Sequence, residues 1–493
     1  MSDKSIQQTS PRRPVRVAII GAGMSGLCMA ATLQDAGIDD FTIFEKAYDV
    51  GGTWRDNTYP GLHCDVPSRY YSYSFRPNPE WSHLLSPGAE IHKYLRQVAG
   101  ERDIVEHIRF GTEVTVARYR DDHWWVTTAE GDEPFDVLIT ATGVLRVPRY
   151  PDIPGLNTFA GRSFHSSQWD HSIVLADKRI GLIGTGSTGV QITSALAGTV
   201  REINIFQRTP QWVYAWPNRQ VSELNRAALR RSHRLNGALY AMWGYIFTRF
   251  FGTAVVKPGL RRKIIQAQCR LNLRLAVRDK ELRAKLTPRD QPLCKRMVFA
   301  GHYYRSLRKP GVHVTTQPID RVEPRGVVTA DGEVHELDLL VLATGFDARA
   351  YVRPLDIVGE GGLSLADAWA DGPAAYRSVA VPGFPNMFML MGPHSPVGNN
   401  SLVPVAEDQA RYATWWINQL RERRIASVSP TGAATAAYGD AMKAAMPQTV
   451  WTTGCSSWYL DKHGLPELFP WAPQRYSELL RAPDMADFDV RTA

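Results

Sequence analysis

The chain has 493 residues, more than one hydrophobic core usually holds, so two or three domains are expected. Its 44% hydrophobic and 22% charged residues are ordinary for a globular protein. The net charge of +8 is compatible with binding to nucleic acid or to an anionic membrane. However, the basic residues stand dispersed among acidic ones and no nucleic-acid module is present, so we predict no nucleic-acid partner. Anionic dinucleotides explain part of the excess.

The cysteines and the N-terminus bear on the cellular compartment. No CxxC motif occurs, and the five cysteines stand far apart: Cys28, Cys64, Cys269, Cys294 and Cys455. A disulfide framework or a thiol redox centre is therefore not expected, no metal site is predicted, and a reducing cytoplasm fits. Residues 1–14 are polar and lack the apolar core of a secretory signal, so we interpret them as a frayed tail.

A first nucleotide site is predicted near the N-terminus. The apolar run 15–20 suits a buried parallel strand, and Gly21, Gly23 and Gly26 follow before a helical stretch that runs to about residue 36. Gly21 permits the tight turn, Gly23 allows a pyrophosphate to approach the backbone, and Gly26 lets the helix pack on the strand. The helix N-terminus would offer N–H groups and partial positive charge to the phosphates.

The next strand and loop complete this site. The strand 41–45 ends at Glu45, 24 residues after Gly21, where a carboxylate can accept hydrogen bonds from a ribose. The loop that follows carries the spacing G-x-W-x₄-Y-P-G-x₃-D, which ends at Asp65, and its cofactor candidates are Gly52, Thr53, Trp54 and Asp65. The alternative for Asp65 is a turn residue without a functional role.

Further along the chain, residues 113–130 alternate and predict a small β-meander. The strand DVLITATG then ends at Thr142 and Gly143. Between residues 159 and 170 stands the pattern F-x-G-x₃-H-x₃-W-D, and its fixed positions are Phe159, Gly161, His165, Trp169 and Asp170. By composition this stretch is an ordinary polar linker with a buried His and Trp.

A second βα unit with the same glycine spacing begins at residue 179, and its cofactor candidates are Gly184, Gly186, Ser187 and Gly189. Its second strand ends at Arg208 and Thr209, again 24 residues after the first glycine. A carboxylate suits a free 2′-hydroxyl and an arginine suits a 2′-phosphate, so we expect FAD in the first site and NADPH in the second. Charge-assisted hydrogen bonds of roughly 1.5–3 kcal/mol correspond to about 10- to 150-fold preference for NADPH. The alternative for Arg208 is a solvated surface charge.

Residues 220–290 are predicted to be mainly helical and rich in arginine, as an insertion into the second domain. Within them the apolar and aromatic stretch 237–256 carries one charge, Arg249. Its length nearly spans a bilayer, but its glycines and its charge argue against a clean span. Three interpretations stay open: the wall of an apolar substrate tunnel, a plain core helix, or peripheral contact with a membrane.

The fingerprint 159–170, the loop ending at Asp65 and the segment with Lys295 and Arg296 together resemble the type I Baeyer–Villiger monooxygenases. The resemblance implies FAD and NADPH as cofactors, and dioxygen and a hydrophobic ketone as substrates. It also implies an ester or lactone as product, formed through a C4a-peroxyflavin. Arg296 would be the catalytic cation and Asp65 the acid beside it, with Lys295 contacting the NADP phosphate. Ala300 departs from the family pattern, which leaves open how this segment is held.

The resemblance also gives the domain plan, an α/β chain of two Rossmann-like dinucleotide-binding domains with a helical insertion. The boundaries are 1–150 and 376–493 for the FAD domain, 151–225 (with the linker) and 295–375 for the NADPH domain, and 226–294 for the insertion. A strand near residue 388 and a helix from about Val405 belong to the last part. His394 and Asn399 either line the substrate pocket or are plain loop residues, while His165 and Trp169 would couple movement of the NADPH domain to flavin reduction.

Three other functions compete with this one. A heteroatom monooxygenase, which oxidises sulfur or nitrogen, shares the cofactors but lacks the Trp-Asp ending of the fingerprint. A flavin disulfide reductase shares the two-dinucleotide plan but needs a pair of redox cysteines. A dinucleotide sensor would bind the cofactors without turnover. The identity of the ketone and the oligomeric state are not predicted.

Overall fold

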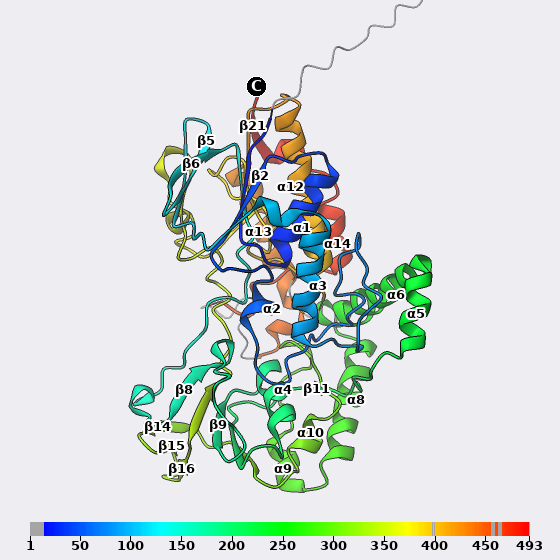
Figure 1. Ribbon diagram of the computed structural model, residues 1–493, viewed down its shortest axis with the longest axis vertical. Coiled ribbons are helices and arrows are strands. Elements are labelled where there is room, and N and C mark those ends of the chain that lie inside the picture. The colour runs from blue at the N-terminus through cyan, green and yellow to red at the C-terminus, as the bar shows by residue number, and fades with distance from the viewer. Residues whose placement is uncertain (1–13, 397, 399, 455–458, 462–465, 493) are drawn as a thin grey trace, which may run out of the picture.

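The computed structural model describes residues 14–396, 398, 400–454, 459–461 and 466–492. Residues 1–13 of the expected frayed tail lie outside this part. Two five-stranded parallel sheets lie one above the other along the long axis of the molecule (Figure 1). Helices pack on one face of each sheet, and a smaller sheet packs on the other. The prediction of an α/β chain with two dinucleotide-binding units is confirmed.

The first sheet has the strand order β19-β7-β1-β2-β3, and all neighbours pair in parallel. Its strands are β1 (Val17–Ile20), β2 (Phe41–Glu45), β3 (Ile108–Phe110), β7 (Val137–Thr140) and β19 (Met387–Met389). Every residue of β1, β7 and β19 is buried, because helices cover one face of this sheet and the β-meander of residues 116–135 covers the other. Because β19 comes from the last quarter of the chain, both ends of the sequence build this unit.

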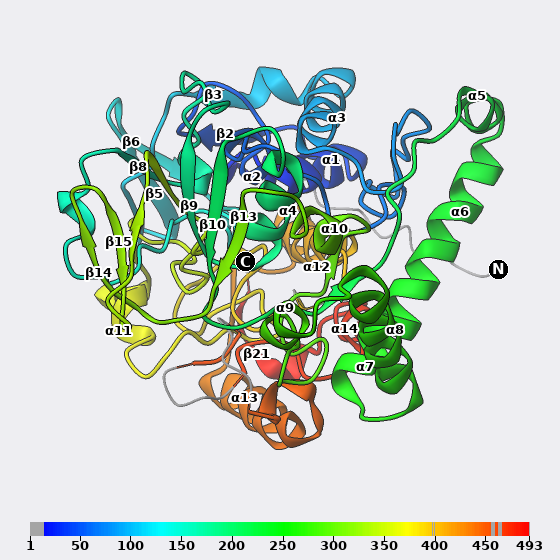
Figure 2. The same cartoon turned by 90° about the horizontal axis from the view of Figure 1, so that it is seen from below.

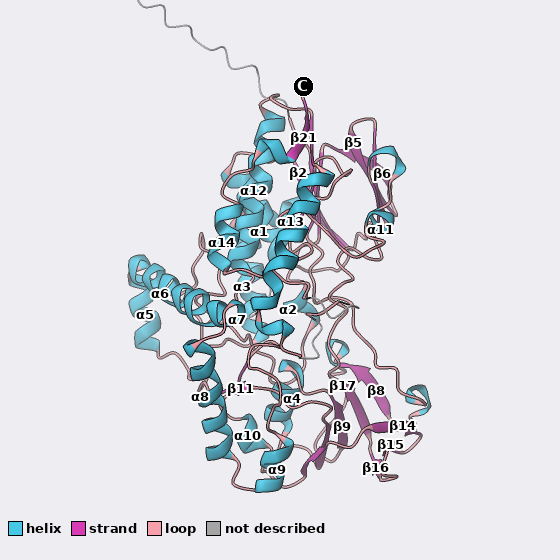
Figure 3. Cartoon of the chain, turned by 180° about the vertical axis from the view of Figure 1, so that it is seen from behind, coloured by secondary structure: helices cyan, strands magenta, loops and turns pink. Residues whose placement is uncertain are grey.

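The helices of the first unit are α1 (Met24–Asp35), α3 (Gly88–Glu101) and α12 (Val403–Arg421). α1 and α12 pack against each other (Figure 3) although nearly 400 residues separate them. The short helix α2 (Thr53–Asp56) follows the Gly51-Gly52 turn. The helix expected from about Val405 begins at Val403, within the usual uncertainty of helix ends.

The second sheet has the order β13-β10-β9-β17-β8, again entirely parallel. Its strands are β8 (Arg162–His165), β9 (Arg179–Ile183), β10 (Glu202–Phe206), β13 (Val312–Thr315) and β17 (Leu339–Leu342). Helices α4 (Ser187–Leu196) and α10 (Tyr303–Ser306) pack together beside it. Part of the fingerprint stretch, which by composition is a polar linker, is thus the edge strand β8, because its backbone pairs with β17.

Smaller sheets flank these units. The predicted meander is the sheet β18-β4-β5-β6, with β4 (Val116–Arg120), β5 (His123–Thr128), β6 (Gly131–Phe135) and β18 (Asp356–Val358). The others are formed by β14 (Ile319–Glu323), β15 (Gly326–Thr329) and β16 (Val334–Glu336), by β20 (Ser427–Pro430) and β21 (Phe488–Arg491), and by β11 (Val213–Tyr214) and β12 (Val298–Phe299).

The predicted helical stretch forms one edge of the molecule (Figure 2). It contains α5 (Glu223–Arg231), α6 (His233–Ile246), the π-helical turn η4 (Phe247–Gly252), α7 (Thr253–Val256), α8 (Leu260–Ala276) and α9 (Lys280–Lys285). Among the described helices, none is both long enough and apolar enough to cross a bilayer. Within 237–256, Phe247, Phe251 and Val255 are buried, whereas Tyr245 is 68% exposed.

The remaining helices are α11 (Leu365–Ala368), α13 (Gly432–Ala445) and α14 (Pro473–Leu479). Short 3₁₀ turns occupy Ile104–His107, Leu156–Thr158, Ser166–Gln168, Glu360–Gly362, Met446–Gln448, Val450–Thr452 and Met485–Asp487.

Two connections join the units, and they pair with each other. The backbone N–H of Arg149, on the outgoing connection, donates to Gly345 O at 2.9 Å on the returning one. Asp347 N–H donates back to Val147 O at 2.8 Å. The crossover is therefore a two-stranded strap, and relative movement of the units must bend both connections together.

One expectation about the cysteines is wrong. Cys28, Cys64 and Cys269 are free and buried, which agrees with the expectation that the chain has no disulfide framework. Cys294, however, is disulfide-bonded. The spacing of cysteines in the sequence gave no sign of this bond.

The glycine that packs α1 on β1 offers a test of the fold. A Cβ built on Gly26 lies 1.9 Å from Gly21 O, so the Gly26→Ala substitution must push the helix away from the strand. We expect loss of about 3 kcal/mol or more of stability and loss of bound flavin. Gly439→Ala, in α13, meets no atom within 4 Å and is the matched control. It should stabilise the chain by about 0.5–1 kcal/mol. Denaturant midpoints and flavin content measure both, and equal behaviour of the two variants would contradict the packing argument.

Candidate functional site

Two glycine turns have the same geometry in the two units. Gly21 has φ +107° and Gly184 has φ +116°, conformations that favour glycine. A Cβ at Gly26 would lie 1.9 Å from Gly21 O, and one at Gly189 would lie 2.1 Å from Gly184 O. Each turn therefore requires glycine at the first and third positions so that the helix can sit against the strand.

The middle glycines leave open space at the helix starts. A Cβ at Gly186 meets no atom within 4 Å, and one at Gly23 meets only Gly52 Cα, at 3.8 Å. Neither α1 nor α4 has a side-chain cap, so the described residues leave their first N–H groups to another acceptor. These cradles fit the pyrophosphates of two dinucleotides.

Glu45 ends β2 and is only 5% exposed. Its Oε2 accepts from Ala22 N–H at 2.9 Å, while Oε1 accepts from Ala47 N–H and from Arg55 Nη1 at 3.0 and 3.1 Å. Each carboxylate oxygen can accept about two hydrogen bonds, so Oε2 retains one for a ligand hydroxyl. The protein therefore fixes this acid in position beside the first glycine turn.

The loop after Gly51 lies against the same turn. Thr53 Oγ1 is 3.5 Å from Leu145 O, and Trp54 Nε1 donates to Tyr71 Oη at 3.1 Å. The Cα atoms of Gly52 and Gly23 face each other, since a Cβ built on either points at the other's Cα. Gly52 thus lies against the first glycine turn, while the cofactor contacts of Gly52, Thr53 and Trp54 stay predictions.

A basic corner forms at the end of the second unit's β10. Lys295 Nζ donates to Thr209 Oγ1 at 2.9 Å and lies 3.4 Å from Asp290 Oδ2. Arg208, next to Thr209, is exposed and makes no ion pair with another described residue. The fold thus brings Lys295 to Arg208 and Thr209 across a separation of 86 residues.

Asp65 connects the first unit to the second glycine turn. Ser187 Oγ, at the start of α4, donates to Asp65 Oδ2 at 2.7 Å, and the acid is only 9% exposed. Two further contacts join the same loop to α4. Thr188 Oγ1 donates to Tyr59 Oη at 3.3 Å, and Gln191 Nε2 donates to His63 O at 2.9 Å.

Arg296 shares the enclosure of Asp65. Its Nη1 donates to Asn400 O at 3.1 Å, and Gln211 Nε2 donates to Arg296 O at 2.7 Å. Between the two groups, burial raises the pKa of the Cys64 thiol to about 12, while Arg296 opposes this shift and Asp65 adds to it. A guanidinium and a carboxylate thus act on one buried thiol.

The structure shows how the segment around Arg296 is held, the point that Ala300 left open. β12 pairs in parallel with β11, with Val298 opposite Val213 and Phe299 opposite Tyr214. Ala300 N–H then donates to Tyr214 O at 3.2 Å. Backbone pairing, which does not depend on the side chain at position 300, fixes the position of Arg296.

His165 of the fingerprint sits at the interdomain strap and is completely buried. Its Nδ1 accepts from Ser167 N–H at 3.2 Å, so the proton must be on Nε2, which is 2.9 Å from Gly345 O. Burial lowers the pKa of His165, which keeps the imidazole neutral. Gly345 O also accepts from Arg149 N–H, so His165 is bonded to the point where the two connections meet.

The other fingerprint residues have local roles. A Cβ on Gly161 would lie 2.7 Å from Asp338 O and 2.7 Å from the Phe159 ring, so only glycine fits there. Trp169 is 8% exposed and packs in a cluster that also contains Tyr59 of the first unit. Asp170 accepts from the Ser172 N–H and hydroxyl in a turn.

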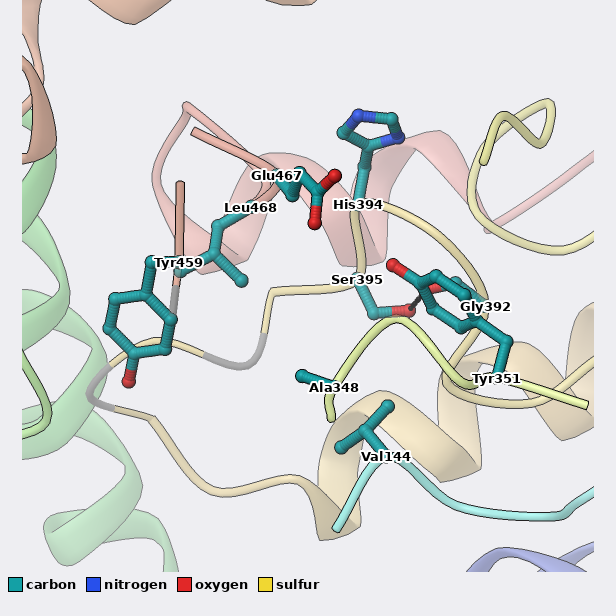
Figure 4. Close-up of a pocket in the computed structure, with 9 residues that line it drawn as sticks. All are labelled: Val144, Ala348, Tyr351, Gly392, His394, Ser395, Tyr459, Glu467 and Leu468. Atoms are coloured by element: carbon teal, nitrogen blue, oxygen red, sulfur yellow. Dashed lines mark hydrogen bonds between the residues drawn. The ribbon is translucent and has the colours of Figure 1, made fainter. Parts of the chain in front are cut away.

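A small pocket lies where the connections meet the C-terminal segment (Figure 4). Val144 comes from the outgoing connection, Ala348 and Tyr351 from the returning one, and His394 from the loop after β19. Burial lowers the pKa of His394 to about 4. His394 thus lines a pocket, and that this pocket binds the substrate stays a prediction. Asn399 lies outside the described residues.

A second, larger pocket of about 500 Å³ opens in the helical insertion. Its walls are mostly aromatic, and the lining residues are Tyr214, Ala215, Trp216, Pro217, Trp243, Ile246, Phe250, Phe251 and Gln268. The ring centroids of Trp216 and Phe299 are 5.3 Å apart, and Phe299 N–H is 3.5 Å from Asp65 Oδ1. One aromatic side chain therefore separates this pocket from the enclosure of Asp65 and Arg296.

Sequence reasoning missed several of these residues. The sequence places Ser187 with the cofactor but not with Asp65, and it singles out neither Gly345 nor the aromatic residues Tyr214 and Trp216. The Ala-Thr-Gly sequence at residues 343–345, which repeats that at 141–143, is the available signal for Gly345. Among the described residues, no cluster of His, Cys, Asp and Glu is arranged to hold a metal ion.

Comparison with known proteins agrees with this geometry. The model of the flavin-binding monooxygenase-like family matches residues 14–355. A Baeyer–Villiger monooxygenase of Streptomyces coelicolor is 38% identical over 484 residues, covering 97% of this chain and 92% of its own. An uncharacterised monooxygenase of Mycobacterium tuberculosis is 50% identical over 476 residues, covering 96% of both chains.

Solved structures give the same result. The closed crystal structure of cyclohexanone monooxygenase superposes with a TM-score of 0.86 at 29% identity, covering 97% of this chain and 99% of that one. An oxidised steroid monooxygenase bound to NADP gives 0.85 at 29% identity, covering 97% and 100%. The chain therefore belongs to the flavin-binding monooxygenase-like family and, within it, to the Baeyer–Villiger monooxygenases, which use FAD and NADPH.

Proposed function

We propose that the chain uses NADPH and dioxygen to convert a hydrophobic ketone to an ester or lactone, with Arg296 and Asp65 as its catalytic pair. The observation that supports this most directly is that both residues act on the buried Cys64 thiol, which neighbours Asp65 in the chain, while Asp65 also accepts from Ser187 at the second glycine turn. Bound FAD, once reduced by NADPH, supplies the activated oxygen for this reaction. The contribution of the chain is to bind both dinucleotides, to stabilise negative charge and to exclude water.

Arg296 is proposed as the fixed cation of the reaction. A guanidinium stays protonated at any working pH and stabilises negative charge on oxygen, both on the attacking species and on the carbonyl as it becomes tetrahedral. Its backbone is held by β12 and by Gln211, so the charge needs no reorganisation during the reaction. Opposite charges about 4 Å apart attract by roughly 4 kcal/mol at an effective dielectric of 20.

Asp65 is proposed to orient this cation and to moderate its charge. Ser187 Oγ donates to the same carboxylate. Asp65 is therefore in direct contact with the start of α4, where the second pyrophosphate would bind. Binding of the nucleotide in the second unit and the state of the catalytic acid are thereby linked through one hydrogen bond.

The side chains at the ends of β2 and β10 are proposed to decide which dinucleotide binds in each unit. Glu45 ends β2 and favours the free ribose hydroxyls of FAD, whereas Arg208, Thr209 and Lys295 favour the 2′-phosphate of NADPH. The residues of both glycine turns are proposed to hold the pyrophosphates. The cytoplasm is proposed as the compartment because three cysteines are free and buried, and the disulfide of Cys294 is the observation that stands against it.

The ketone is proposed to be bulky and apolar. The 500 Å³ aromatic pocket lies one ring away from Asp65 and is large enough for a multi-ring or long-chain body. Trp243, Ile246 and Phe250 of the stretch 237–256 line it. This arrangement supports the interpretation of that stretch as part of a substrate tunnel.

The Arg296→Ala substitution tests the reaction. The variant should still bleach its flavin with NADPH but form about 10³-fold less ester, because roughly 4 kcal/mol of charge stabilisation is lost. Oxygen uptake and mass-spectrometric detection of products from cyclic, linear, aryl and steroid ketones measure this. Arg305→Ala, an exposed arginine on α10, is the control and should retain the ester yield. A retained yield in Arg296→Ala would remove this residue from the mechanism, and sulfoxide or N-oxide as the only products of the wild-type chain would favour a heteroatom monooxygenase.

The Arg208→Ala substitution tests the basic corner. Loss of a charge-assisted hydrogen bond of roughly 1.5–3 kcal/mol should raise KM for NADPH by about 10- to 150-fold. KM for NADH should change little, because NADH has no 2′-phosphate. Steady-state kinetics with both nucleotides measure the ratio, and equal effects on the two would refute the assignment of the phosphate site.

His165 is proposed as a positioning residue that couples the strap to flavin reduction. His165→Ala leaves Gly345 O without its side-chain donor, which should slow flavin reduction by about tenfold at unchanged FAD content. His165→Gln, which restores an N–H donor, should recover most of the rate. Stopped-flow reduction by NADPH separates this role from a merely structural one, which would lower FAD content in both variants. An unchanged reduction rate in His165→Ala would refute the coupling.

A further inference from the structure

Helix α8 has two apolar faces. One packs into the core through residues that are at most 4% exposed, namely Ile265, Cys269 and Leu273. The other is exposed to solvent. The helix itself lies on the side of the molecule that carries the insertion (Figure 1). The large apolar residues of the exposed face are Leu260, Ile264, Leu271 and Leu275, and their exposed fractions are 72%, 45%, 56% and 72%.

These exposed residues form one continuous stripe. They stand at positions i, i+4, i+11 and i+15, which an α-helix brings within about 60° of each other around its axis. Ala267, which is also exposed, fills the gap between Ile264 and Leu271. Scattered exposed leucines need no explanation, but an aligned stripe along a 17-residue helix marks an interaction surface.

The charge around the stripe is all of one sign. Residues 233–278 contain nine basic and no acidic residues, which is enough to account for the whole net charge of +8. The basic residues are therefore not dispersed evenly, as the overall composition suggests. Outside this segment acidic and basic residues balance almost completely.

The bases beside the stripe are also not neutralised within the structure. Exposed on α8 itself are Arg261, Lys263, Arg270 and Arg274. None of these four pairs with an acid among the described residues, whereas Arg230 on α5 pairs with both Glu80 and Glu223. The stripe is thus an apolar surface bordered by cations that lack counter-ions.

We propose that this face of α8 docks on the surface of an anionic phospholipid bilayer. Apolar side chains aligned on one face and bases on its borders are the two features by which a helix binds in the headgroup region. Each Lys or Arg near an anionic leaflet adds to binding, and the attraction weakens with salt. A second copy of the chain fits less well, because two such helices would bring like charges together without an acid to compensate them.

The lipid contact lies beside the aromatic pocket. Gln268, which lines that pocket, follows Ile264 by one helical turn and precedes Leu271 by three residues. Docking would therefore hold the pocket close to the bilayer, where an apolar ketone concentrates. The contact also falls on residues 260–275 instead of 237–256, whose Phe247 and Phe251 are buried.

Co-sedimentation of the full-length holoenzyme with vesicles tests the proposal. Vesicles of phosphatidylcholine alone are compared with vesicles of phosphatidylcholine and phosphatidylglycerol, at low and high salt. The wild-type chain should bind the anionic vesicles and dissociate at high salt. Lys263→Glu with Arg274→Glu should lower the partition coefficient by at least about tenfold, and Leu271→Ser with Leu275→Ser should do the same.

The matched control is Arg118→Glu with Arg325→Glu, which changes the net charge equally. These exposed arginines, on β4 and on the turn before β15, form no ion pair within the described part of the chain. It should bind vesicles like the wild-type chain. FAD content and NADPH oxidation should be unchanged in all variants, which separates this proposal from the enzymatic one. Absence of vesicle binding at low salt, equal loss in the control, or a concentration-dependent dimer that the leucine variant abolishes would each overturn the proposal.

Discussion

A hydrogen bond of 2.7 Å between Ser187 and Asp65 connects the two halves of this molecule at the point where their chemistry must meet. Ser187 begins α4, which carries the second glycine turn, and Asp65 ends the loop that follows the first one. Because Asp65 is only 9% exposed, its charge needs partners. The site therefore exists only when the two units are docked, and separate domains could not form it.

The same dependence appears at the interdomain strap. Gly345 O accepts both Arg149 N–H and His165 Nε2–H, so one carbonyl ties the outgoing connection, the returning connection and the edge strand β8. A neutral imidazole suits this position, because its Nε2–H donates to Gly345 O and its Nδ1 accepts from Ser167 N–H. A protonated ring would bring an N–H against the N–H of Ser167. The fingerprint histidine therefore lies where the two connections between the units meet.

The sequence predicts contacts between residues that are close in the chain and misses contacts between residues that are far apart in it. Both glycine turns, the strands around them and the acid or base at each strand end depend on neighbours within about 30 residues, and these predictions agree with the structure. The pairing of β11 with β12, the contact of Ser187 with Asp65 and that of Lys295 with Thr209 join positions 85 to 122 residues apart. No local pattern encodes such contacts. Arg296 is predicted only through resemblance, because the strand that follows it, β12, is two residues long.

The distribution of charge, by contrast, can be read from the sequence. The overall composition hides it, because the net charge does not show where the basic residues stand. A net charge of +8 has one meaning when it is spread over the surface and another when it lies in 46 consecutive residues. Helical periodicity then decides the geometry: with the 3.6-residue turn, the apolar residues of α8 divide into a buried face and an exposed stripe, and the bases fall between them. A helix that serves only to cover the core needs one apolar face. The second face has no role inside the described part of the chain, and unpaired cations along its border select an anionic surface as its partner.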